Sequence, residues 1–306
     1  MKLHKKKFGT RPIINSKSHP TENLSWFLDS VLKPIIVLTE SYIQDSQNLL
    51  QKTNNVTFPS DCKIYSCDFE GLYSNINLSH ALEIICEFMK DKIKSTFFNI
   101  KAFHTFLKLV FDNNYFTYNK KYYKQVKGIA MGTKCGPSIA NIYLYILEKN
   151  FLVIHKPLHY SRFIDDIFII TINNFDILIL KNFFHNLVLN IENNNNIVNF
   201  LDLVLSLNCF TNKLRTSLYR KPTNTFQQLL VSSNHQKNII DNNPFGSFLR
   251  IRRICTFTHD FIFHSKILIK QLLTRGYSID HLYKIYNTIL KIDRDKLLNY
   301  KKKKVH

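Results

Sequence analysis

The stretch YSRFIDDIFII, residues 160–170, places Asp165 and Asp166 between two runs of β-branched and aromatic residues. Such runs are typical of buried strands, so we expect strands at 160–164 and 167–172 with a tight turn between them. Because successive side chains of a strand point to opposite faces, only a turn lets both acids reach one site. A polar hairpin tip is the simpler alternative, but like charges beside apolar strands are costly unless a cation relieves them.

Another acid, Asp68, ends a strand predicted over 63–69 (KIYSCDF). A carboxylate at a strand end is often only a cap or turn residue. Two carboxylates from different strands, with a third beside them, can nevertheless hold a pair of Mg²⁺ ions whose other ligands are water and substrate phosphates. One ion then activates an attacking hydroxyl, and the other stabilises the leaving group of a phosphoryl transfer.

Glycine is scarce in this chain, with 7 residues in 306, yet Gly128, Gly132 and Gly136 fall within nine positions. They precede a predicted helix at 137–150 that is apolar on nearly every face and is therefore buried. The glycines serve either a structural turn or a backbone that approaches a flat substrate such as a base or sugar. The order of residues excludes a P-loop.

The remaining pattern predicts an α+β fold with an antiparallel sheet and helices on one side. We expect helices at 79–90, capped by Ser79, at 101–111 and at 175–189, a strand pair at 115–119 and 122–126, and strands at 200–208 and 214–219. From about residue 245 the pattern is helical and basic, which places a boundary at 223–243.

Charge limits the partners. Lys and Arg total 42 against 22 Asp and Glu, a net charge of +20, which indicates nucleic acid or an anionic membrane surface, although an AT-biased genome produces a similar composition. A membrane-surface protein predicts a basic amphipathic helix without a carboxylate site, so we expect no membrane partner. The six cysteines show no metal-binding spacing, which indicates reduced thiols in an intracellular protein.

Three segments, in this order, resemble the motifs of reverse transcriptases: YSCDFEGLYSNI (65–76) resembles motif A, GIAMGTKCGPSIANIYL (128–144) motif B, and YSRFIDDIFII motif C. The resemblance is strongest to the Penelope-like retroelement lineage, whose motif A typically reads D-x-x-S-L-Y-T-N-I and whose motif B contains M-G-T-K. Further agreement lies in RPIINSKSHPTENLS (11–25), NFLDL (199–203), LRTSLYRKPTNT (214–225), FLRIRRIC (248–255) and RGY (275–277).

The resemblance implies a right-hand polymerase with partial fingers at 1–60, an antiparallel-sheet palm with a primer-grip hairpin at 61–222, and a basic helical thumb at 223–306. It implies an RNA-directed DNA polymerase of a retroelement, which extends a DNA primer along an RNA template with deoxynucleoside triphosphates. The expected cofactor is a pair of Mg²⁺ ions, with Mn²⁺ as a substitute. The expected compartment is the nucleus.

Roles for individual residues follow from the same resemblance. Asp68 and Asp165 would be the principal metal ligands and Asp166 the accompanying acid. Tyr73 would lie under the sugar and exclude a 2′-hydroxyl, unless it is an ordinary buried aromatic. Met131, Gly132 and Arg11 would contact the nucleotide, Tyr219, Arg220 and Lys221 would grip the primer, and Arg250, Arg252 and Arg253 would contact phosphates unless they form a merely solvated basic face.

The sequence also departs from the family pattern at Gly71, Ser74, Asn77 and Cys135-Gly136. These positions lie beside the expected ligands, so they put fidelity or efficiency in doubt rather than the chemistry. The family often carries a longer N-terminal region and a GIY-YIG endonuclease, which are not found here, so we expect target cleavage to come from elsewhere. A second hypothesis is therefore a truncated or domesticated remnant that binds nucleic acid without polymerising.

Overall fold

The computed structural model describes residues 13–93, 98–184, 186–193, 196–223, 225 and 227–299. The chain divides into two compact units, Met1–Ile43 with Cys67–Glu192, and Gln44–Ser66 with Asn193–His306. We describe each unit by itself. The division into fingers, palm and thumb stays a prediction.

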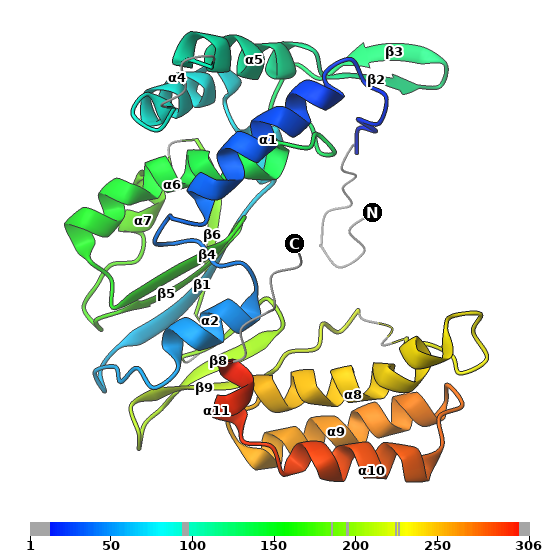
Figure 1. The fold of residues 1–306 in the computed structure, drawn as a ribbon. Coiled ribbons are helices and arrows are strands. Elements are labelled where there is room, and N and C mark those ends of the chain that lie inside the picture. Colours follow the sequence, from blue (N-terminus) through cyan, green and yellow to red (C-terminus); the bar gives the residue numbers. More distant parts are fainter. Residues whose placement is uncertain are drawn as a thin grey trace. The chain divides into compact units, whose positions relative to one another are not determined.

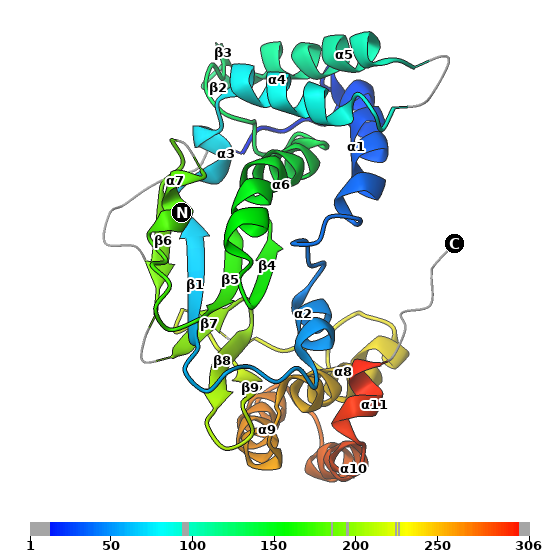
Figure 2. The ribbon, with the colours of Figure 1, turned by 90° about the vertical axis from the view of Figure 1, so that its left-hand side faces the viewer.

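The first unit contains a four-stranded sheet with the order β4-β5-β1-β6, and α6 lies along one face of it (Figures 1 and 2). The strands are β1 (Lys63–Phe69), which enters from the second unit, β4 (His159–Phe163), β5 (Asp166–Thr171) and β6 (Leu189–Glu192), with a separate hairpin of β2 (Tyr115–Tyr118) and β3 (Lys121–Lys124). The helices are α1 (Glu22–Ile36), α3 (Leu72–Asn75), α4 (Leu78–Met89), α5 (Ile100–Asp112), α6 (Gly136–His155) and α7 (Ile179–Asn182). As its all-round apolar pattern predicts, α6 is buried along most of its length.

The second unit combines an antiparallel sheet of order β7-β8-β9 with a helical bundle. Its elements are α2 (Ser46–Thr53), β7 (Ile197–Phe200), β8 (Leu203–Asn208), β9 (Lys213–Leu218), α8 (Lys237–Ile254), α9 (Thr258–Leu273), α10 (Ile279–Leu290) and α11 (Arg294–Leu298). Phe248, Phe261 and Leu282 are fully buried in the bundle core. Among the described helices of either unit, none is long and apolar enough to cross a membrane.

The prediction of a helix at 175–189 was wrong. Among the described residues of this range, only α7 is α-helical, and the chain then continues into β6. The reason is tertiary, because the backbone N–H of Glu70, just beyond β1, donates to the carbonyl of Val188 at 2.9 Å. This bond joins Val188 to the chain just beyond β1, and Leu189 then opens β6, so tertiary pairing overrides the helical period at the end of the segment.

Smaller differences concern caps and turns. Asn77 rather than Ser79 caps α4, because its side chain accepts a hydrogen bond from the N–H of His80. The strand predicted at 200–208 is two strands, since the chain turns at Leu201, whose φ is +54°. The β2–β3 turn is Asn119-Lys120, one residue earlier than predicted. Finally, the basic helical region begins at Lys237, inside the predicted boundary.

Candidate active site

The three candidate acids lie where neighbouring strands of the first unit end. Asp68 is the second-last residue of β1, Asp165 belongs to the β4–β5 turn, and Asp166 opens β5. The N–H of Phe69 donates to the carbonyl of Asp165 at 3.3 Å, which holds the end of β1 against that turn. All three acids are partly exposed. The structure therefore brings residues 97 positions apart in the chain (165 against 68) to one edge of the sheet.

The turn that carries Asp165 is strained. Phe163 pairs with Asp166, so the turn has only two central residues, Ile164 and Asp165. Ile164 has a φ of +54°, and a β-branched residue rarely adopts this left-handed conformation, which costs of order 1–3 kcal/mol. Such strain persists only where surrounding contacts hold it.

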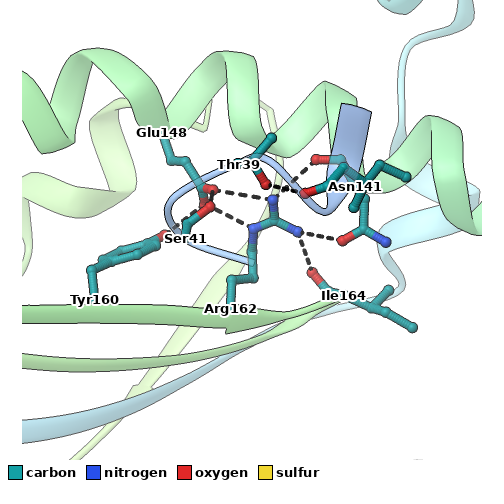
Figure 3. A network of polar contacts seen from close by, with 8 residues as sticks. Thr39, Ser41, Asn141, Glu148, Tyr160, Arg162 and Ile164 are labelled. Carbon is teal, nitrogen blue, oxygen red and sulfur yellow. Dashed lines mark hydrogen bonds and ion pairs between the residues drawn. The ribbon is translucent and has the colours of Figure 1, made fainter. Parts of the chain in front are cut away.

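Those contacts come from Arg162, which the sequence analysis left without a role (Figure 3). Its Nη1 donates to the Ile164 carbonyl at 3.1 Å and to the Asn141 side chain at 2.9 Å. Its Nε and Nη2 donate to the carboxylate of Glu148 at 2.8 and 3.1 Å. The side chains of Arg162 and Glu148 are 1% and 0% exposed. An arginine within a predicted buried strand was the only sequence signal for this network.

Glu148 also accepts hydrogen bonds from residues other than Arg162. Ser41 and Tyr160 donate their hydroxyls to its carboxylate. Burial, and then the charge of Glu148, raises the pKa of Tyr160 well above its ordinary value, so the phenol stays protonated and keeps donating. The segment that contains Ser41 is joined to β4 as well, because the N–H of Arg162 donates to the Ser41 carbonyl at 2.7 Å. The network thus connects this segment, α6 and the strained turn.

The two glycines of motif B with positive φ are explained by close approaches within the chain. Gly128 has a φ of +76°, and an added Cβ would lie 2.3 Å from the carbonyl oxygen of Tyr73. Gly132 has a φ of +119°, and its Cβ would lie 2.0 Å from the carbonyl oxygen of Ile14. The structural alternative therefore accounts for both glycines. Contact of Met131 and Gly132 with a nucleotide stays a prediction, and Arg11 lies outside the described residues.

Alanine at Gly128 is expected to destabilise the protein by at least about 2 kcal/mol, because backbone strain and overlap with Tyr73 add together. The matched control is Gly246→Ala in α8, where an added Cβ meets nothing within 4 Å. Removing a helical glycine there should be neutral or stabilise by up to about 1 kcal/mol. Urea unfolding of the two variants decides the matter, and equal stability would contradict the assigned close approach.

Tyr73 connects motif A, motif B and the acidic turn. Its carbonyl accepts a hydrogen bond from the N–H of Ile129 at 2.7 Å. Burial, and then the nearby Asp165 carboxylate, raises the pKa of Tyr73 to about 12, so its phenol is neutral at physiological pH. The side chain is only partly buried. The Asp165 charge therefore acts on the Tyr73 phenol, and contact of Tyr73 with a substrate sugar stays a prediction.

The acids suit a hard cation that arrives with substrate. Within the described part of the chain, no three His, Cys, Asp or Glu side chains form a ready-made metal cluster. Mg²⁺ needs no such cage, since it commonly takes one or two carboxylates and completes its shell with water and phosphate oxygens. Asp68 and Asp165, partly exposed at adjacent strand ends, fit that type of site.

The predicted primer-grip residues lie in the second unit, just after β9. Tyr219 and Arg220 line an open cavity of about 480 Å³ together with Arg250 of α8. Arg220 donates to Nδ1 and to the carbonyl of His264, while Lys221 is exposed. The cavity therefore gathers cationic side chains, and nucleic-acid binding by these residues stays a prediction.

The three arginines predicted on the thumb helix differ in their surroundings. The Arg250 side chain is 60% exposed and pairs with Asp202 at 2.5 Å. Arg252 donates to the Ile292 carbonyl at 3.1 Å, and Arg253 donates to the side chain of Gln47, also at 3.1 Å. Arg252 and Arg253 thus have structural contacts within the unit, and Arg250 is the most available of the three for a phosphate.

His264 predicts an acid-sensitive contact in the second unit. Burial, and then the charge of Arg220, lowers its pKa from 6.5 to about 4. A neutral His264 accepts from Arg220 at Nδ1, and Nε2 lies 3.0 Å from the hydroxyl of Ser217. Because the folded pKa lies below the unfolded one, this stabilisation is complete above about pH 6.5 and is lost as the pH falls towards 4.

We expect His264→Gln to flatten the dependence of stability on pH in this window. The exposed His281 supplies the control variant, and an unchanged slope in His264→Gln would contradict the expectation.

Solved structures of polymerases are similar to this chain in fold. Telomerase from Candida albicans, in complex with a fragment of telomeric RNA, gives a TM-score of 0.60 at 12% identity and covers 92% of this chain and 53% of that one. The RNA-dependent RNA polymerase of a human picobirnavirus gives 0.56 at 11% identity, covering 90% and 56%. Apo telomerase from Candida tropicalis gives 0.50 at 15% identity, covering 92% and 52%. The chain spans about half the length of these proteins.

These likenesses define a right-hand polymerase fold, which confirms the predicted fold class. The model of the family described as reverse transcriptase (RNA-dependent DNA polymerase) matches residues 3–199. The chain belongs to the reverse transcriptase family. This is a family of nucleotidyltransferases, so the prediction of an enzyme class is confirmed. No curated protein matches the chain.

Proposed function

We propose that this chain is an RNA-directed DNA polymerase that extends the 3′-hydroxyl of a DNA primer along an RNA template. The observation that carries the proposal is the backbone hydrogen bond from Phe69 to Asp165, because it joins the end of β1, which carries Asp68, to the turn that carries Asp165 in a chain of this family. The net charge of +20 supplies attraction for a template–primer duplex, which should weaken steeply with salt.

Asp68 and Asp165 would hold two Mg²⁺ ions, with Asp166 beside them and Mn²⁺ as a substitute. When bound, the ions supply activation of the primer hydroxyl and stabilisation of the leaving pyrophosphate. The protein's part is to keep the carboxylates in place, which Arg162 does by supporting the Ile164 carbonyl of the turn. Tyr73, whose phenol is neutral at physiological pH, would meet the sugar of an incoming nucleotide.

Primer extension on poly(rA)/oligo(dT), with Mg²⁺ and then Mn²⁺, tests the proposal. Extension by thymidine triphosphate with either metal supports a polymerase. Duplex binding without extension under both metals would overturn it and favour the second candidate, a truncated or domesticated remnant that only binds nucleic acid.

We further propose that the chain comes from a retroelement of the Penelope-like lineage and acts in the nucleus. Support comes from the residue patterns of motif A and motif B and from the flanking segments 11–25 and 214–225. Synthesis primed by the 3′-hydroxyl of nicked chromosomal DNA, measured with a tagged chain in nuclear extracts, tests the proposal. Exclusion of the tagged chain from nuclei would contradict it.

Alanine at Tyr73 is expected to admit ribonucleotides, because removing the ring opens the space that a 2′-hydroxyl needs. The ratio of incorporation of deoxy- to ribonucleotides should fall by about tenfold or more, the effect of roughly 1.4 kcal/mol. Tyr73→Phe keeps the ring and should keep the discrimination. Unchanged sugar selectivity in Tyr73→Ala would assign the residue to the core instead.

A further inference from the structure

The β2–β3 hairpin is a basic, aromatic element that the proposed mechanism does not use. All its strand residues except the partly buried Phe116 are exposed, and Figure 1 shows the hairpin extending past the helices of the first unit. Tyr118 and Tyr122 are 68% and 84% exposed. An isolated two-stranded hairpin is only marginally stable in water. Exposed tyrosines on such an element therefore indicate a surface that binds a partner.

The register divides these side chains between two faces, because directly paired residues of an antiparallel ladder point the same way. One face carries Tyr115, Thr117, Tyr122 and Lys124, and the other carries Phe116, Tyr118, Lys121 and Tyr123. The Phe116 and Tyr123 rings stack at 5.5 Å, and the ammonium group of Lys124 lies 5.7 Å from the centre of the Tyr115 ring. Each face therefore combines flat aromatic rings with a lysine.

Charge identifies the partner. Lys120, Lys121, Lys124 and Lys127 lie in or next to the hairpin, and no Asp or Glu occurs from residue 113 to residue 147. An acidic counterpart with flat, stackable groups fits this surface, whereas a second copy of this basic chain does not. Single-stranded nucleic acid has both properties, since every base offers a π-face and every linkage a phosphate.

The hairpin is also attached to the candidate active site within the same unit. At its base, the N–H of Gln125 donates to the Asn114 carbonyl at 2.8 Å, and the Gln125 side chain donates to the Lys127 carbonyl at 2.8 Å. Lys127 precedes Gly128, which packs against Tyr73. A nucleic-acid strand bound by the hairpin would therefore be connected, through a short hydrogen-bonded path along the chain, to Tyr73.

We propose that the β2–β3 hairpin binds single-stranded nucleic acid at its tip, by stacking bases on Tyr118 of one face and on Tyr122 of the other while its lysines contact phosphates. The proposal rests on the proposed function only for the identity of the strand, which would be the unpaired part of the template. Binding itself requires no polymerisation, so the two proposals can fail separately.

Fluorescence anisotropy with a labelled single-stranded oligo(rU), and with the matching oligo(dT), tests the proposal on the full chain. Tyr118→Ala with Tyr122→Ala should weaken binding by at least about tenfold, since base stacking is worth roughly 1–3 kcal/mol per base. Tyr122→Phe keeps a stacking ring and should bind normally. Phe210→Ala, which removes a ring that is 93% exposed in the other unit, should also bind normally.

Salt dependence separates stacking from charge. Lys120→Ala with Lys121→Ala should reduce the slope of log affinity against log salt by about 1.4, at roughly 0.7 per phosphate contact. Unchanged oligonucleotide affinity in the double tyrosine variant would overturn the proposal. So would self-association that this variant abolishes while RNA affinity stays constant, since the hairpin would then serve a second copy. Primer extension by the unaltered chain on poly(rA)/oligo(dT), measured in parallel, reports on the proposed function alone.

Discussion

Replacing Asp165 with alanine is expected to abolish primer extension while leaving the affinity for a template–primer duplex nearly unchanged. The carboxylate lies in the β4–β5 turn against the end of β1, where it would be a principal metal ligand. Metal ions supply several kcal/mol of transition-state stabilisation, so the loss of a ligand should lower the rate by about three orders of magnitude or more. Duplex binding depends instead on many lysines and arginines.

The measurement combines primer extension with duplex affinity for Asp165→Ala and for Asp91→Ala. Asp91 is an exposed acid of the same unit, just after α4. The Asp91→Ala variant therefore controls for the loss of one negative charge. Asp91→Ala should extend primers at the normal rate. Retained synthesis in Asp165→Ala would remove Asp165 from the mechanism.

Replacing Arg162 with methionine is expected to cost about 3–5 kcal/mol of stability, because it leaves the carboxylate of Glu148 buried and uncompensated. The Ile164 carbonyl and Asn141 also lose their donor. Since Arg162 supports the strained turn, we further expect the rate of nucleotide addition to fall while the KM for the nucleotide changes little. Urea unfolding and steady-state primer extension measure the two effects.

A second substitution separates folding from positioning. Arg162→Met combined with Glu148→Gln removes the uncompensated charge, so most of the lost stability should return. The Ile164 carbonyl still lacks its donor, so the rate should stay low. Full recovery of the rate together with stability would show that the network serves folding alone.

Local patterns predicted the strands on which the acids lie. The apolar runs at 63–69 and 160–172 are dense in β-branched and aromatic residues, and these belong to β1, β4 and β5. The same reasoning failed at 175–189, because the end of this segment is hydrogen-bonded to the chain beyond β1 and leads into β6, and no local period reveals such contacts. The predicted cap, Ser79, was also wrong: both residue types serve as caps, and Asn77 is the one whose side chain accepts from the N–H of His80.

The candidate site likewise contains residues that the sequence predicted and residues that only the structure revealed. Motif order and residue type were enough to select Asp68, Asp165 and Asp166 and to predict the family. The sequence contained Arg162 and Glu148 but gave no reason to pair them, because they lie on different elements and meet only when α6 packs on the sheet.

The sequence alone determined the carboxylates, the strands that carry them, the glycine-rich turn and the net positive charge from which a polyanionic partner is predicted. These depend on residue type, short-range period and net charge. Only the tertiary structure decided what Gly128 and Gly132 touch, what supports the turn at Ile164 and that both faces of the β2–β3 hairpin are exposed. Burial and contacts between distant segments arise from the packing of all elements together, and no local stretch of sequence specifies them.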